Sequence, residues 1–176
     1  MAAQLLAPDT LSEAERVQSI TSKMKGSVVL RAQVLLDRAH FSSGEIDAAY
    51  GKNLRTSISG YQNANSLPAS GIVDAPTWTV LNTDTAPMLV IYTILDTDVA
   101  GPFNPIPSEW VDKAKMKALG YTSAKEALSE KFHESPTLLA QLNPGKNFGS
   151  AGEEIVVPNV VAISELPKAA NMIRSH

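Results

Sequence analysis

The residue types that usually carry chemistry are sparse in this sequence and do not form a catalytic pattern. The chain has no Cys, which excludes thiolate nucleophiles, disulfides and Cys-ligated zinc. Its histidines, His40, His133 and His176, lack the i+4 or HxH spacing of a metal site. Neighbouring acids such as Asp96 and Asp98 fall in expected turns, whereas a glycosidase needs two carboxylates held across a cleft. We therefore expect no enzyme activity, no metal and no cofactor in this chain.

The clearest pattern is a repeated stretch. Residues 43–48 read Ser-Gly-Glu-Ile-Asp-Ala, residues 70–75 read Ser-Gly-Ile-Val-Asp-Ala, and a Leu follows each Asp at the same distance. In each copy a Ser-Gly turn leads to an apolar residue, and an Asp then stands where a helix would begin. An Asp side chain accepts hydrogen bonds from the first N–H groups of a helix. The repeat therefore predicts two turns with Asp47 and Asp74 as helix caps.

Helical periodicity surrounds this repeat. Apolar residues at helical spacing predict an amphipathic helix over residues 10–26, and further helices over residues 27–39, 52–65 and 74–81. The first of these would form an N-terminal helix within residues 1–26. The other three would pack together as a compact helical module over residues 27–86.

The pattern changes after residue 87. Residues 88–95 are rich in β-branched and aromatic side chains and predict a strand, and residues 154–158 predict another. Capping signals between them predict helices over residues 108–119, 123–132 and 135–142. The two strands can pair antiparallel, with the last two helices on one face. The expected fold class is α+β, mostly α, with a second domain over residues 87–160 and a linker or tail over residues 161–176.

A series of short motifs runs in order between Val34 and Leu81. They are Gly44-Glu45-Ile46-Asp47, Tyr50-Gly51, Tyr61-Gln62, Leu67-Pro68, Gly71-Ile72-Val73-Asp74 and Thr77-Trp78 with Leu81. This series resembles the three-helix peptidoglycan-binding module found beside bacterial cell-wall hydrolases and transpeptidases. The family more often has Asp-Gly where this chain has Asp47-Ala48, and Phe-Gln where it has Tyr61-Gln62. The resemblance implies a small helical module that binds the cell wall.

A second series lies in the other half of the chain. It comprises Tyr92-Thr93-Ile94, Glu126-Ala127-Leu128, Phe132, Ser135, Leu138-Leu139, Leu142-Asn143-Pro144 and Ile155-Val156-Val157-Pro158. This series resembles a LysM glycan-binding domain, which has a βααβ arrangement. In that family a short Gly-Asp-Thr loop joins the first strand to the first helix. Here residues 96–120 intervene, and they form an insertion beside the place where the family binds glycan.

Together these resemblances imply a non-catalytic segment that binds peptidoglycan or another N-acetylglucosamine-containing glycan and holds a cell-wall enzyme against its substrate. Paired modules of this kind commonly precede the catalytic domain of an L,D-transpeptidase, whose Cys nucleophile this chain lacks. A catalytic domain would then have to follow His176, and the protein would act in the cell envelope, periplasmic or extracellular. One alternative is a structural or interaction segment that packs on its own catalytic domain without binding sugar. A stand-alone hydrolase is a third hypothesis.

A site for sugar rings and short peptides needs aromatic faces and a few fixed polar groups. Core packing is the alternative for the large aromatics, which fall on apolar helical stripes, and local turn chemistry is the alternative for the second half. The candidates in the first half are Tyr50, Tyr61, Gln62, Thr77 and Trp78. Those in the second half are Asp96, Thr97, Asn143, Pro144 and Gly145.

Charge and hydropathy exclude two further classes of partner. The formal net charge is -3, and no run of Lys and Arg forms a basic stripe, so we expect no nucleic-acid partner. The longest apolar run, residues 88–92, is far too short to span a bilayer. The first residues lack the basic start and apolar core of a secretory signal. If the protein is exported, we expect the signal to be missing from this sequence.

Overall fold

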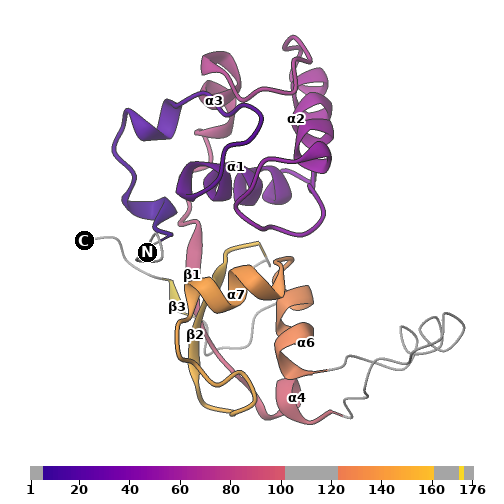
Figure 1. Cartoon of the computed structure of the whole chain (residues 1–176). Coiled ribbons are helices and arrows are strands. Elements are labelled where there is room, and N and C mark those ends of the chain that lie inside the picture. The colour runs from indigo at the N-terminus through magenta and orange to yellow at the C-terminus, as the bar shows by residue number, and fades with distance from the viewer. Residues whose placement is uncertain (1–5, 102–122, 161–170, 173–176) are drawn as a thin grey trace, which may run out of the picture.

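The computed structural model describes residues 6–101, 123–160 and 171–172. Within these residues the fold is α+β and mostly helical, as the sequence predicts. Figure 1 shows the helices α1, α2 and α3 in the upper half and a small sheet with α4, α6 and α7 in the lower half. The predicted helix over residues 108–119 lies outside the described residues.

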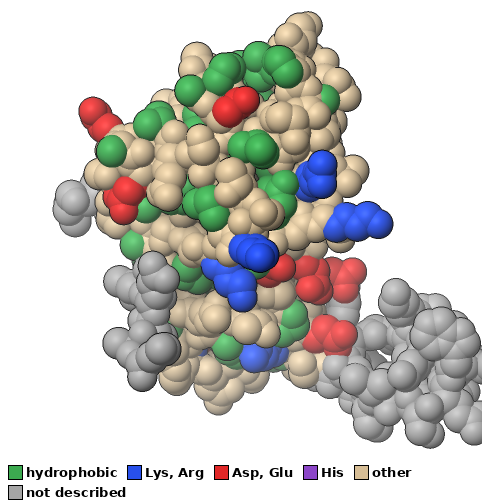
Figure 2. All heavy atoms as spheres, turned by 45° about the horizontal axis from the view of Figure 1, so that its top comes forward, with side chains coloured by type: hydrophobic (Ala, Val, Ile, Leu, Met, Phe, Trp, Pro, Cys, Tyr) green, Lys and Arg blue, Asp and Glu red, His purple; other side chains and the backbone are tan. Residues whose placement is uncertain are grey.

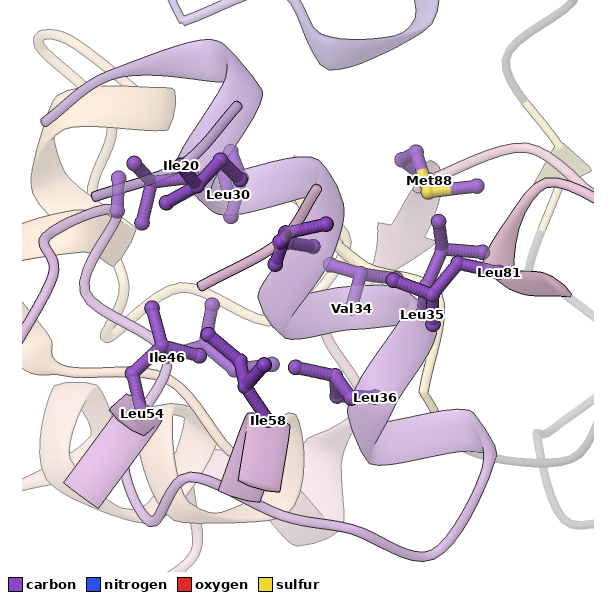
Figure 3. Packing of buried hydrophobic residues seen from close by; sticks show 14 of the residues in the cluster. Ile20, Leu30, Val34, Leu35, Leu36, Ile46, Leu54, Ile58, Leu81 and Met88 are labelled. Carbon is purple, nitrogen blue, oxygen red and sulfur yellow. The ribbon is translucent and has the colours of Figure 1, made fainter. Parts of the chain in front are cut away.

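Helix α1 (Ser27–Arg38) is the centre of the upper half. Residues 29–37 are all buried, because α2 (Lys52–Ala64), α3 (Ala75–Leu81) and the N-terminal segment pack around this helix. A helix that is surrounded on all sides must carry apolar residues on more than one face. Figure 3 shows how residues from every part of the upper half converge on it. The labelled residues of this core are Ile20, Leu30, Val34, Leu35, Leu36, Ile46, Leu54, Ile58, Leu81 and Met88.

Two buried glutamines hold the two repeated turns. The Gln33 side chain on α1 accepts hydrogen bonds from the backbone N–H groups of residues 47 and 48, and its Nε2 donates to Asp47 Oδ1 at 2.9 Å. The Gln62 side chain on α2 accepts from Gly71 N–H at 3.0 Å and donates to the carbonyl of Ile72 at 2.8 Å. Buried backbone groups in irregular segments need partners of this kind. Each turn is therefore fixed by one amide from the preceding helix.

The predicted helix over residues 10–26 is wrong. This segment contains only the short 3-10 turns η1 (Pro8–Thr10) and η2 (Glu15–Val17), and it then runs extended across both repeated turns. Ile20 exchanges two backbone hydrogen bonds with Val73, at 3.0 and 3.2 Å, and Lys25 is bridged to Ala49. An extended backbone is needed for these long-range bonds and is incompatible with i→i−4 helical bonding. Pairing with distant turns therefore overrides the local helical periodicity.

The two Asp residues of the repeat differ in role. Asp74 caps α3 as predicted, because its carboxylate accepts from the backbone N–H of Thr77 at 3.2 Å and from the Thr77 hydroxyl at 2.6 Å. Asp47 does not cap a helix, since α2 begins only at Lys52, after Gly51. Its Oδ1 accepts instead from the N–H of Ala49 at 3.0 Å, which is an Asx turn. The predicted cap at Asp47 is wrong because four residues, 48–51, separate it from the first residue of the helix.

The lower half is built on a small antiparallel sheet. Strand β1 (Leu89–Thr93) lies in the middle, with β2 (Glu154–Pro158) on one side and the two-residue strand β3 (Asn171–Met172) on the other. The β1–β2 pair is antiparallel as predicted, with Ile91 opposite Val156. Strand β3 was not expected, because it falls in the predicted linker or tail. The short helix α4 (Asp96–Val99) follows β1 where the sequence predicted a turn.

Helices α6 (Ala124–Lys131) and α7 (Pro136–Leu142) complete the lower half. Ser123 caps α6 and Ser135 caps α7, each accepting a hydrogen bond from the N–H three residues ahead, at 3.1 and 3.0 Å. These caps agree with the Ser-x-x-Glu and Ser-Pro signals of the sequence. A separate core lies between these helices and the sheet. It comprises Val90, Tyr92, Ile94, Leu128, Phe132, Leu139, Ile155 and Val157.

The end of α1 joins the two halves. The Arg38 guanidinium pairs with Asp84 at 2.8 Å and donates to the carbonyls of Ala86, Pro87 and Asn159. A planar guanidinium with five N–H donors is suited to hold several oxygens at once. The backbone of Ile46, in the first repeated turn, also bonds to His133 and Ser135 on either side of Glu134, at 2.8 and 2.9 Å. The first turn is therefore attached to the link between α6 and α7.

The amide of Gln62 should be essential to the stability of the upper half. We expect Gln62→Leu to lower the free energy of unfolding by about 3 kcal/mol, because it leaves the buried N–H of Gly71 and its neighbouring polar groups without partners. Urea unfolding followed by circular dichroism measures this loss. The matched control is Asn63→Leu at the next, exposed position of α2, where we expect a change within about 0.5 kcal/mol. Equal stability of the two variants would contradict the assigned role.

Candidate functional site

Four of the predicted site residues in the upper half belong to its core. Gln62, Thr77 and Trp78 are 0% exposed and Tyr61 is 7% exposed. Gln62 and Thr77 are brought together, with Gln62 Nε2 3.0 Å from the Thr77 hydroxyl. The indole N–H of Trp78 donates to the carbonyl of Gln18 at 2.8 Å, and the Tyr61 ring packs edge-on against Phe41. Their burial argues against direct ligand contact by these four side chains.

Tyr50 is half-buried between the two repeated turns. Its hydroxyl donates to the carbonyl of Gly71 at 2.7 Å, so the side chain joins the first turn to the second. Gly71 has a positive φ of 72°, and a Cβ at this position would lie 2.7 Å from Cγ of Arg55. A left-handed conformation without space for a side chain favours glycine. The ring of Tyr50 is therefore held at the edge of the second turn.

The predicted residues in the lower half divide into two kinds. Asn143 is 4% exposed, and its amide bonds to the backbone N–H and carbonyl of Val156 at 2.6 and 2.7 Å, which ties the end of α7 to β2. Asp96 and Thr97 are exposed at the start of α4, and Pro144 and Gly145 are exposed in the turn after α7. These four residues keep the accessibility that a glycan ligand would need.

A large cleft, which the sequence did not predict, lies between the two halves. Its volume is about 780 Å³. One wall comes from the end of α1 and the first repeated turn, and the other from α6 and the start of α7. Figure 2 shows acidic side chains gathered at this waist of the molecule. The described lining residues are Asp37, His40, Ser42, Gly44, Glu45, Glu126, Ser129, Glu130, His133, Glu134 and Pro136.

Glu134 is the unusual group in this cleft. It is 1% exposed, and neither oxygen of its carboxyl group has a hydrogen-bond partner among the described residues. Burial raises the pKa of Glu134 from 4.5 to about 9, because the charged form is desolvated. The carboxyl group is therefore protonated at neutral pH in the free protein. A buried polar group without a partner destabilises the fold and calls for a functional explanation.

His133, the residue before Glu134, connects the two walls of the cleft. Its Nδ1 lies 2.9 and 3.1 Å from the two carboxylate oxygens of Asp37 on α1. The Asp37 side chain is 6% exposed and that of His133 is 46% exposed, so solvent reaches the pair from one side. Together with the backbone bonds of Ile46 on either side of Glu134, this contact holds the α6–α7 link against the upper half.

A second polar cluster lies in the lower half beside α4. The Asp98 carboxylate accepts from the Tyr92 hydroxyl at 2.6 Å and from Lys131 Nζ at 3.0 Å. Burial raises the pKa of the Tyr92 hydroxyl, and the hydrogen bond to Asp98 raises it further. Burial lowers the pKa of Lys131, but its hydrogen bonds to Tyr92 and Asp98 outweigh this and leave the pKa raised. The cluster is fully paired and fixes α4 against α6.

Part of the upper half matches a known domain family. Residues 25–81 match the family whose description reads "Putative peptidoglycan binding domain". The match spans α1, α2, α3 and both repeated turns, and it confirms the predicted peptidoglycan-binding resemblance of this part of the chain. No curated protein was found that matches the chain.

Two structural features bear on other classes of function. In the part of the chain that the structure describes, no helix is long and apolar enough to cross a membrane. No three His, Asp or Glu side chains of those same residues lie together in a way that could hold a metal ion.

Ionisation of Glu134 should make stability depend on pH. The folded protein keeps the Glu134 proton up to about pH 9, whereas the unfolded chain releases it near pH 4.5. The contribution of Glu134 therefore lowers the free energy of unfolding as the pH rises between these two values. Gln cannot ionise and has nearly the same shape. We therefore expect Glu134→Gln to gain about 3 kcal/mol relative to the wild type between pH 5 and pH 7.5. Urea unfolding at both pH values measures this, and a stability difference independent of pH would contradict it.

Proposed function

We propose that this chain is a non-catalytic peptidoglycan-binding segment that targets a cell-wall enzyme to its substrate. The observation that carries the proposal is the match of residues 25–81 to a peptidoglycan-binding domain family. The family match supports an association with the cell wall, and in this proposal the protein acts in the periplasm or outside the cell. The absence of Cys supports a binding role over an L,D-transpeptidase reaction within this chain, since that reaction needs a Cys nucleophile.

The second repeated turn offers the most accessible apolar surface of the matched region. Ile72 is 37% exposed and is the large hydrophobic residue of the described part of residues 25–81 that is most open to solvent. Exposed small apolar residues surround it along the chain, at Pro68, Ala69, Ala75 and Pro76. Figure 2 shows hydrophobic side chains gathered at the α2–α3 end of the molecule. Apolar surface beside the half-buried ring of Tyr50 suits the face of a sugar ring.

The lower half supports a second glycan contact in this proposal. Its antiparallel β1–β2 pair and its two capped helices are compatible with the LysM resemblance over residues 87–160. The exposed residues Asp96, Thr97, Pro144 and Gly145 are the groups that we assign to sugar binding there. The parent enzyme in this proposal is an L,D-transpeptidase with its catalytic domain after the second half.

Burial of the predicted aromatic site residues favours one alternative. Trp78 and Tyr61 offer no face to a sugar, as expected of a segment that instead packs on its own catalytic domain. The two functions differ in what the isolated chain does. A wall-binding segment associates with peptidoglycan, whereas a packing segment binds only the catalytic domain.

We expect the purified chain to sediment with insoluble peptidoglycan, and Ile72→Asp to weaken this association about tenfold, because a charge would have to be desolvated in place of an apolar side chain. The matched control is Val17→Asp, at a large hydrophobic residue that is 53% exposed but lies outside residues 25–81. Cosedimentation at several peptidoglycan concentrations measures both variants. A wild-type chain that stays in the supernatant would contradict wall binding and favour the packing segment.

A further inference from the structure

The cleft between the two halves is strongly acidic. Five carboxyl groups line it: Asp37 from α1, Glu45 from the first repeated turn, Glu126 and Glu130 from α6, and Glu134 from the α6–α7 link. The described residues that line it include no Lys and no Arg. Glu134 is neutral in the free protein and Asp37 faces His133, so the negative charge of the cleft comes mainly from the glutamates of its rim. A hollow with an excess of negative charge concentrates ligands of the opposite sign. The charge of the cleft therefore favours a cationic ligand.

A second observation is independent of this charge. Glu134 is buried in the wall of the cleft with both oxygens unpartnered among the described residues. Ser43, between the lining residues Ser42 and Gly44, likewise has a buried hydroxyl without a partner there. Folded proteins rarely leave buried polar groups unpaired unless a ligand or water satisfies them. The unpaired carboxyl of Glu134 marks the position where a donor is missing.

We propose that this cleft binds the primary ammonium group of a short peptide, the chemistry that the diamino acid of a peptidoglycan stem peptide presents. An ammonium group has three donors and no acceptor, so it can bond to Glu134 and to a rim carboxylate at once. The volume of about 780 Å³ is far larger than one ammonium group and has room for the peptide that carries it. This inference rests on the proposed peptidoglycan binding and names the part of the polymer that the cleft recognises.

The carboxylates do not favour a bare metal ion. No group of three His, Asp or Glu side chains in the described residues is arranged to hold one. The acids are instead spread along both walls of the cleft. This arrangement suits a cationic group that is part of a longer ligand. The ligand would then contact the first repeated turn on one side and α6 on the other, and it would add contacts between the two halves.

Binding should release a proton. Glu134 holds its proton in the free protein at neutral pH, because burial raises its pKa. A bound ammonium group favours the ionised carboxylate, so the proton leaves as the ligand enters. Affinity should therefore rise with pH between about 6 and 8. The other titratable groups that line the cleft are Glu126, Glu130 and His133 on the same wall as Glu134, and Asp37, His40 and Glu45 on the opposite wall.

The test uses the full chain and two probes. One is muramyl-L-alanyl-D-glutamyl-L-lysine with a free side-chain amine, and the other is the same compound with that amine acetylated. We expect isothermal titration calorimetry to show at least tenfold tighter binding of the free amine, and a measured enthalpy that depends on the ionisation enthalpy of the buffer. Equal binding of the two probes would overturn the proposal, as would an enthalpy that is independent of the buffer.

Variants then assign the effect to the cleft. Glu134→Gln should weaken binding of the free amine about tenfold and abolish the buffer dependence. Glu45→Gln, at an exposed rim position that cannot disturb folding, should weaken it about threefold. The control, Glu154→Gln, removes an exposed acid on β2 outside the cleft and should leave binding unchanged. If all three substitutions weaken binding equally, the affinity comes from general charge attraction. That outcome would overturn the proposal that the cleft is the binding site.

Cosedimentation separates failure of this inference from failure of the proposed function. A chain that sediments with peptidoglycan but binds neither probe overturns the cleft site and leaves wall binding intact. If the chain neither sediments nor binds a probe, both proposals are overturned. A chain that binds the free amine without sedimenting supports the cleft and contradicts wall targeting.

Discussion

The structure depends on buried side-chain amides that satisfy the backbone of irregular segments. Gln33 and Gln62 each bond to one of the repeated turns, and Asn143 bonds to both backbone groups of Val156 in the middle of the edge strand β2. A turn can be buried only if its N–H and C=O groups find partners, and no regular ladder supplies them here. With these amides in place, the turns become rigid surfaces on which other segments can pair. The extended N-terminal segment does so at Ile20 and Lys25.

This constraint explains why residues that resemble a ligand site are internal. A Gln or Asn beside aromatic residues has the polar and apolar groups that sugar binding requires, and the same groups can also close a turn within a small core. The side-chain amides of Gln62 and Asn143 bond to backbone groups, and that of Gln62 also bonds to the hydroxyls of Thr77 and Ser70. In the proposed function the ligand therefore contacts a surface that these amides hold in place, the second repeated turn at Ile72, because the amides themselves are already hydrogen-bonded.

Sequence patterns within a few residues predicted the elements whose hydrogen bonds and caps are formed by residues close together in the chain. The helices of the upper half, the caps at Asp74, Ser123 and Ser135, and the β1–β2 pair follow from periodicity and capping within a few residues of each site. The N-terminal helix failed because Ile20 pairs with Val73, more than fifty residues away, and periodicity carries no information on that contact. The cleft was not predictable for the same reason. Asp37 and His133 lie 96 positions apart and meet only through the packing of the two halves.

Glu134 shows how the two halves are coupled energetically. Its backbone neighbours are bonded to Ile46, so the backbone of Glu134 is fixed by the link between the first repeated turn and α6–α7. The fold therefore tolerates a neutral, unpaired acid at the junction, at a cost in stability that grows with pH. Any donor that pairs with this acid removes that cost and strengthens the junction at the same time. If the cleft binds its ligand as proposed, ligand binding and the attachment of one half to the other are coupled, because both involve the same α6–α7 link.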